Sequence, residues 1–344
     1  MEDLRDHFYQ VLAGLNDLQG GVSSPETIKD ACANALGDLH EYVPLLGFIL
    51  RSTNVRNAFE LYAPLQRLCE KVLEPGESPL TRKTQLILSS EWYYEAQVHP
   101  AKTYLENYVL IGLPAPESSN PLLLPLAGHE IGHPLWHVHS LRDHFFQVAA
   151  SKIIEKVLHD KTAFKDAYPP EPDPEHITPT YLVQHVNRLF SNGVHWLACQ
   201  AEETFCDFVG MRLFGYSYIN AFAYMVAPRL SMERVEQYPK LTTRVQNLLN
   251  GAERFDVEVP SGYADLFEDD EDPDYHDSAK YNLMLADSSL AGMVEELGIK
   301  VQELLPDGRI PVPSDAEAQR ILGRLKYVVP AESALSIADI INAA

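Results

Sequence analysis

The chain has 344 residues, of which 46% are hydrophobic and 22% are charged, a balance typical of globular proteins. This length accommodates one large domain or two modest ones. The net charge of -22 argues against nucleic-acid backbones and anionic membranes as binding partners.

Two further features of composition concern the compartment. No apolar run approaches the roughly 20 residues that cross a bilayer, and the start Met1-Glu2-Asp3 is acidic where a secretory signal is basic. The cysteines form no Cys-x-x-Cys pair, so we expect free thiols. The cysteines are Cys32, Cys69, Cys199 and Cys206. We therefore expect a cytoplasmic protein that does not span a membrane.

Residues 1–80 are expected to form a helical N-terminal region. Apolar residues recur at a helical spacing from Leu4 to Leu15 and from Ile28 to Leu50, and a third helix is expected over residues 57–72. The region contains no catalytic constellation, so we interpret it as a helical cap or a partner surface.

The next segment is rich in residues that favour strands. Residues 84–90, 92–94 and 108–112 are predicted to be strands. A peptidase needs an exposed strand because an extended substrate can bind by adding to a sheet edge, and residues 108–112 are the candidate edge. A sheet that only packs against the following helix is an equal alternative.

The sequence His-Glu-x-x-His follows, from His129 to His133. Residues i and i+4 lie about 40° apart around a helix, so the two imidazoles can hold one metal ion. Glu130 lies beside the first ligand and can take a proton from a metal-bound water. Pro134 is expected to bend the helix just after both histidines.

A second helix, expected over residues 194–214, supplies the third ligand. Glu203 would complete a site of two histidines and one glutamate and leave the fourth position to water. Asp207, one turn further on, could accept a hydrogen bond from a ligating histidine. Glu202 is the weaker candidate because its i+4 neighbour is Cys206. Large apolar neighbours imply a helix packed on both sides, where unpaired carboxylates are costly.

His139 is the alternative third ligand, because it lies ten residues after His129, the spacing of the metzincins. That pattern requires a glycine at position 136, where this chain has Trp136. His137 and His144 are interpreted as histidines of the surface or the edge of the core.

The order of these motifs resembles that of the gluzincin metallopeptidases, in which Glu-x-x-x-Asp follows His-Glu-x-x-His on a second helix. The segment Tyr238 to Arg244 is similar to the His-Pro-x-x-x-x-Arg segment of peptidases related to the CAAX prenyl protease and its bacterial heat-shock relatives. In that family the segment follows the third-ligand helix and its histidine helps to stabilise the oxyanion. The resemblance covers about residues 122–250.

Two departures limit what the resemblance implies. Tyr238 replaces the histidine of the family; a phenol can donate a hydrogen bond to an oxyanion but cannot be a cation. The membrane helices of the family are absent, so a prenylated or membrane substrate does not carry over. Arg244 is expected to pair with an acidic residue near the site. The rival oxyanion donors are Tyr216, Tyr218 and Tyr224.

We therefore predict an α+β, mostly helical fold. A zincin-like catalytic core is expected over residues 81–255, with a small β-sheet before the active-site helix, and an acidic loop and helical region over residues 256–344. The acidic run at residues 268–274 is expected to be solvated and mobile, and it lacks the glycine of an EF-hand.

The expected function is that of a zinc metallopeptidase. Zn²⁺ on His129, His133 and Glu203 would activate water, Glu130 would be the general base, and Tyr238 would stabilise the oxyanion. The substrate would be a peptide or protein, and a regulatory protein partner is possible on this pattern. The alternatives are a non-catalytic or regulated interaction module with a zincin fold and an enzyme that hydrolyses a non-peptide amide.

Overall fold

The structure, a computed structural model, describes residues 2–21, 24–53, 59–73, 84–91, 97–99, 108–117, 120–228, 234–269, 271–326 and 337–343. The chain divides into two compact units. The N-terminal unit contains Met1–Glu70 and Glu74–Ser119, and the C-terminal unit contains Lys71–Leu73 and Asn120–Ala344. The division therefore falls at residue 119, not at the predicted boundary near residue 80.

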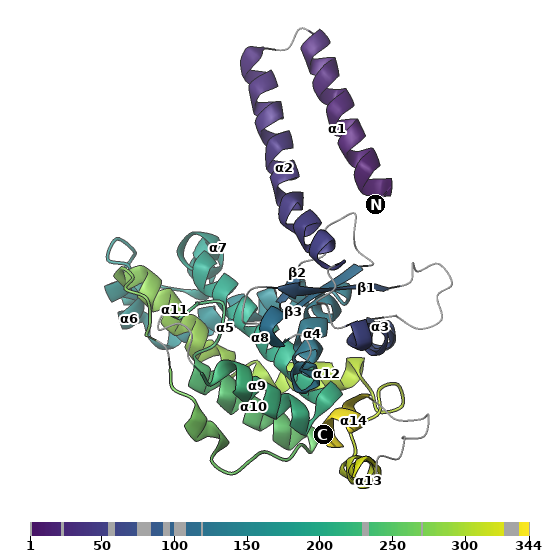
Figure 1. The fold of residues 1–344 in the computed structure, drawn as a ribbon. Helices are drawn as coiled ribbons and strands as arrows, with labels where there is room; N and C mark the ends of the chain where they lie inside the picture. The colour runs from purple at the N-terminus through teal and green to yellow at the C-terminus, as the bar shows by residue number, and fades with distance from the viewer. Residues whose placement is uncertain are drawn as a thin grey trace. The chain divides into compact units, whose positions relative to one another are not determined.

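Three helices begin the chain, as the apolar spacing predicts: α1 (Glu2–Gly20), α2 (Pro25–Arg51) and α3 (Phe59–Leu73). The side chain of Ser24 caps α2 by accepting a hydrogen bond from the backbone N–H of Thr27. The helices α1 and α2 lie against each other, with the rings of Phe8 and Tyr42 edge to face at 5.5 Å (Figure 1).

A three-stranded sheet completes the N-terminal unit. Its strands are β1 (Gln85–Glu91), β2 (Gln97–His99) and β3 (Tyr108–Pro114), in the order β1-β3-β2. The strand β3 is parallel to β1 and antiparallel to β2. The prediction that residues 108–112 form an edge strand is therefore wrong, because β3 is hydrogen-bonded on both sides. The expected strand at residues 92–94 lies outside the described residues.

The C-terminal unit is helical throughout its described residues, apart from short connections. Its helices are α4 (Leu126–Val138), α5 (Leu141–His159), α6 (Lys161–Ala167), α7 (Pro179–Leu189), α8 (Ser191–Phe214), α9 (Tyr216–Val226), α10 (Leu241–Phe255), α11 (Asp277–Leu290), α12 (Val294–Leu304), α13 (Asp315–Leu325) and α14 (Ile337–Ala343). The fold is thus mostly helical with a small mixed sheet. Within the described ranges, no helix has the length and apolar character that a bilayer span requires.

The helix α8 is the centre of the C-terminal unit. The helices α4, α5, α10, α11 and α12 all pack against it (Figure 1). Its apolar side chains Leu197, Phe205 and Phe208 are buried on different sides of the helix. The helix α8 therefore lacks the broad solvent-exposed side of a typical amphipathic helix. Because α11 and α12 contact α8 as α10 does, the predicted boundary at residue 255 does not mark a separate domain.

The acidic run is attached to the unit at two described residues. Asp269 accepts a hydrogen bond of 2.8 Å from the backbone N–H of Thr242, at the start of α10. Asp272 pairs with Arg234 at 3.0 Å and with Lys240 at 2.9 Å. The expectation of a merely solvated run is therefore wrong for these two carboxylates, because the run meets its counter-charges in the segment before α10.

Candidate metal centre

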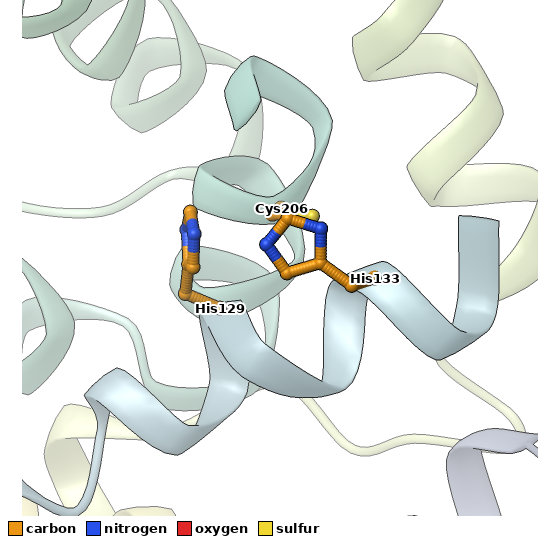
Figure 2. Close-up of side chains that lie close together, drawn as sticks. All are labelled: His129, His133 and Cys206. Atoms are coloured by element: carbon orange, nitrogen blue, oxygen red, sulfur yellow. The ribbon is translucent and has the colours of Figure 1, made fainter. Parts of the chain in front are cut away.

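The two histidines lie on one side of α4, as their spacing predicts. Their rings rise from the same side of the helix, with centroids 5.2 Å apart and planes at 80° (Figure 2). Pro134 lies inside α4 after both histidines, and the helix continues to Val138. Both imidazoles are largely enclosed, with side chains 11% and 17% exposed.

Close contact between α4 and α8 brings a carboxylate to these imidazoles. A Cβ atom on Gly132 would lie 2.7 Å from the Cα atom of Cys206, and one on Gly128 would lie 3.0 Å from the Cα atom of Gly210. Such distances are shorter than van der Waals contact, so the two backbones can approach this closely only with glycine at these positions of α4. The glycines occupy the side of α4 next to the one that carries the histidines.

Glu203 of α8 faces both imidazoles. Its Oε2 atom lies 3.2 Å from Nε2 of His129, and its Oε1 atom lies 3.7 Å from Nε2 of His133. Ligands of a tetrahedral zinc ion at bond lengths near 2.1 Å are about 3.4 Å apart. The Oε2 atom is buried and has no hydrogen-bond partner of good geometry among the described residues. Each imidazole therefore lies near the ligand-to-ligand spacing of such a site from one oxygen of the Glu203 carboxylate.

The other ring nitrogens are held by carboxylates. Nδ1 of His129 lies 2.9 Å from Oδ1 of Asp207, and Nδ1 of His133 lies 2.9 Å from Oε1 of Glu202. A carboxylate accepts from Nδ1–H, which leaves the Nε2 lone pair free to bind a metal. Both imidazoles are thus fixed in the tautomer that a metal site requires.

This cluster of carboxylates favours positive charge. Burial alone lowers the pKa of His129, but the hydrogen bond to Asp207 and the nearby carboxylate of Glu203 outweigh burial and raise it to about 10. Burial also lowers the pKa of His133, and Glu202 reverses the effect, so that this pKa is raised as well. Between Glu203 and the two rings, a proton or a metal ion is therefore favoured electrostatically.

Asp207 is held by two side chains besides His129. Arg244 donates to it from Nε at 2.7 Å and from Nη2 at 2.8 Å, and the hydroxyl of Tyr218 donates at 2.7 Å. Burial raises the pKa of Asp207, but the guanidinium of Arg244 holds it well below its usual range, so this group is a carboxylate. The contacts expected for Asp207 and Arg244 are present; their effect on a metal stays a prediction.

Cys206 offers another ligand atom. Its sulfur and the ring nitrogens of His129 and His133 lie within 4.8 Å of one another, so this buried group could hold a metal ion (Figure 2). Burial raises the pKa of the thiol well above its usual range, and the carboxylate of Glu203 raises it further. The thiol therefore stays protonated unless a metal ion displaces the proton.

Glu130 is buried beside the histidines, with 5% of its surface exposed. Burial raises its pKa, and the positive charge of His129 and His133 partly opposes that rise. A carboxylate with a raised pKa is a better proton acceptor near neutral pH.

His139 does not join the metal-binding group. It is the C-cap of α4, about 15 Å along the helix axis from His129 at 1.5 Å per residue. After burial, the charges that lower its pKa are those of Arg309 and Lys300, away from the imidazole pair. The metzincin-like alternative is wrong because α4 remains helical to Val138, past the position where that pattern turns.

The tyrosines differ in how they lie. Tyr218 is buried and donates to Asp207, so its hydroxyl is engaged. The ring of Tyr238 lies 5.3 Å from the guanidinium carbon of Arg244, and 39% of its surface is exposed. Tyr216 and Tyr224 are exposed on α9. The structure thus brings Tyr238 next to Arg244, which itself lies 3.6 Å from Glu203.

The sequence reasoning missed the role of Glu202. It was set aside because it shares a helix side with Cys206, but it reaches Nδ1 of His133 and lies 3.7 Å from Nε2 of His137. A signal was available: a ligating histidine donates its other ring N–H to an acceptor such as a carboxylate, and of two adjacent glutamates on one helix one can face a metal and the other a ring nitrogen.

No protein-family model matches the chain, and neither curated proteins nor solved structures give a match. The resemblance to gluzincins therefore stays a prediction, and the functional argument depends on the geometry of the residues.

Proposed function

We propose that the chain is a zinc metallopeptidase with a zincin-like catalytic core, in which His129, His133 and Glu203 hold the metal. One observation carries the proposal. The Nε2 atoms of both imidazoles face the Glu203 carboxylate at 3.2 Å and 3.7 Å, while both Nδ1 atoms bind other carboxylates. Two imidazoles and one carboxylate are the donor set of catalytic zinc with an open fourth position. A site of His129, His133 and Cys206 is the competing ligand set.

Zinc, when bound, supplies a water of lowered pKa, about 7, and polarises a substrate carbonyl. Glu130 then acts as general base: it accepts the proton of the attacking water and delivers it to the nitrogen of the leaving amine as the C–N bond breaks. Its burial and raised pKa support this role. Tyr238 is the proposed hydrogen-bond donor to the oxyanion, because the hydroxyl of Tyr218 is already engaged by Asp207.

The proposed substrate is a peptide or protein in the cytoplasm. Free thiols at all four cysteines support a reducing compartment. A second candidate function, a protein-interaction module, is favoured by the exposed apolar side of α2 in the N-terminal unit. The two functions are compatible in one chain because they use different units.

The deciding experiment compares the wild type with Glu130→Gln on a mixed peptide library read by mass spectrometry, with metal content measured in both. We expect chelator-sensitive cleavage by the wild type, and no cleavage by Glu130→Gln at unchanged metal content. Glu253→Gln, an exposed substitution of the same kind on α10, is the control and should cleave normally. Cleavage by metal-loaded Glu130→Gln would refute the mechanism, and a wild type that binds metal but cleaves nothing favours the interaction module.

A further inference from the structure

The helix α2 is apolar on two sides, and the described residues of its unit cover only one of them. Tyr42, Leu45 and Phe48 pack into the core of the N-terminal unit with Leu110 of β3. A second row of large apolar side chains is bare, with exposed fractions between 40% and 72%. This row, which we call the α2 seam, consists of Leu36, Leu39, Val43, Leu46 and Leu50. Contiguous apolar surface of this kind marks interaction sites in proteins.

The spacing of the α2 seam specifies a helical partner. Its positions alternate steps of three and four residues, the heptad pattern in which side chains interlock with those of another helix. Cys32, also exposed, extends the series by one step, and the charged Lys29 ends it. With Cys32 included, the steps are the same from either end, so the row matches itself when reversed. In such a pairing Leu36 of one copy meets Leu46 of the other, and Leu39 meets Val43.

The flanks of the α2 seam carry no formal charge. The positions beside the heptad core are Ala33, Ala35, His40, Tyr42, Gly47 and Ile49. The ring of His40 bonds back to the carbonyl of Leu36 on its own helix. In coiled coils these flanking positions select the partner through charge, so an uncharged flank neither selects a charged helix nor repels an identical one. No Lys or Arg occurs in residues 30–50, which disfavours an anionic membrane surface.

We propose that the α2 seam is the contact between two copies of this chain, antiparallel about a two-fold axis. The α1 and α2 helices of both copies then form a four-helix bundle, in which each seam covers the other. This inference is independent of the proposed peptidase function, because it concerns a different unit.

The test is the mass of the full-length protein in solution, by sedimentation over a range of concentrations. The wild type should be a dimer, and Val43→Glu should weaken dimerisation at least tenfold, because it buries two carboxylates in the apolar contact, each against Leu39 of the other copy. Val43 is already exposed in the single chain, so the substitution should leave circular dichroism and metal content unchanged. Val183→Glu, at an equally exposed valine of α7, is the matched control and should stay dimeric. A monomeric wild type, or equal behaviour of both variants, would overturn the proposal.

Crosslinking tests the orientation. In the antiparallel arrangement Cys32 meets residue 50 of the other copy, so Leu50→Cys should form a disulfide-linked dimer under air oxidation while the wild type does not. A link through Cys32 alone in the wild type would overturn this orientation, and so would the absence of a link in Leu50→Cys.

Discussion

At the scale of single residues, the choice between Glu203 and Cys206 decides what kind of site this is. Oxygen and sulfur compete here for the same position opposite two imidazoles. The carboxylate is ionised in this surrounding: burial raises its pKa, but His129 and its neighbours lower it overall. The thiol has to lose a proton in a buried, negative surrounding before it can bind metal. The proton balance therefore favours Glu203.

We expect Glu203→Ala to lose zinc more strongly than Cys206→Ala. Removal of a residue that only orients a ligand weakens zinc binding by up to ~100-fold, and removal of a ligand itself should weaken it more. Cys206→Ala keeps the small volume that contact with Gly132 requires, and its zinc content should stay near that of the wild type. Metal titration with a competing chelator measures both, and the reverse order would transfer the third-ligand role to Cys206.

Glu202→Gln tests whether the carboxylate bound to Nδ1 of His133, the weaker ligand candidate in the sequence, strengthens zinc binding. The amide can still accept from Nδ1 of His133, but without a charge to raise the basicity of the ring, so zinc affinity should fall about 10-fold to 100-fold. Glu236→Gln, a matched change outside the metal-binding group, should leave affinity unchanged. Equal affinities in the two variants would show that Glu202 does not tune the site.

The sequence predicted the residues of the site better than their contacts. The positions of His129, His133, Glu203 and Asp207 follow from helical spacing, which is local information. The engagement of Tyr218 by Asp207 depends on the direction that α9 takes after Gly215, where φ is +57°; the glycine marks the end of α8 in the sequence but does not specify that direction. Neighbouring tyrosines on α9 thus differ in role although they look alike in the sequence.

At the scale of elements, the contact between α4 and α8 sets the geometry of the site. Gly132 is part of the same five-residue motif as the ligands, but its function is to let α8 approach. An added methyl group there meets the Cα atom of Cys206 at 2.7 Å, and this backbone atom cannot rotate away. The distance between α4 and α8 therefore determines the distance between Glu203 and the two histidines.

Gly132→Ala should destabilise the protein by about 1–3 kcal/mol, because overpacking forces the two helices apart. It should also weaken zinc binding, since Glu203 moves with α8. The control is Gly323→Ala in α13, where an added Cβ meets nothing within 4 Å. There the loss of glycine flexibility should be neutral or should stabilise by up to about 1 kcal/mol. Chemical denaturation measures both changes, and equal stabilities would contradict the close-contact argument.

The positions of helices and strands were predictable where the hydrophobic periodicity was strong. The order of the strands in the sheet was not predictable. The helices of residues 2–51 and the strand at residues 108–114 lie close to their predicted places. The central position of β3 was missed because β1 is parallel to it, and parallel strands pair across a long connection that leaves no local mark in the sequence. The alternation of apolar and polar residues along a strand indicates which face is buried, but it does not indicate whether the strand lies at the edge of the sheet.

At the scale of the whole molecule, acid stability depends on carboxylates paired inside the C-terminal unit. Glu171 receives two hydrogen bonds of 2.9 Å from Arg188 and another from the hydroxyl of Tyr181. The bond to Arg188 is the largest cause that lowers the pKa of Glu171 from its usual 4.5. These contacts tie the proline-rich connection before α7 to that helix.

Because the folded pKa of Glu171 is lowered, its contribution to stability is present above about pH 4.5 and is lost as pH falls through the folded value. We expect Glu171→Gln to be less stable than the wild type at pH 7, with the difference shrinking below pH 4.5. Thermal unfolding across this range measures it; Glu175→Gln, at an exposed carboxylate nearby, should keep the wild-type profile. A difference that is constant with pH would mean that the ion pair is not its source.

The division of the chain was predicted less well than its elements. The sheet falls with the N-terminal helices because Leu110 of β3 packs with Tyr42, Leu45 and Phe48 of α2. Such contacts join segments some 60 residues apart, and neither composition nor charge marks them. The boundary expected near residue 80 lies where helix-favouring residues give way to strand-favouring ones, whereas the hydrophobic core of the N-terminal unit contains residues from both sides of it.

The burial of carboxylates along α8 has a consequence for how this protein is made. Arg244 neutralises Asp207, but Glu203 can be enclosed only with a proton on the neighbouring imidazoles or with an ion in their place. Because α8 is the centre of its unit, that neutralisation has to accompany folding and cannot wait until folding is complete. If the proposed zinc ion, and not a proton, supplies this neutralisation during folding, a cell short of zinc would contain less of the mature protein, and its deficit would appear in abundance as well as in activity.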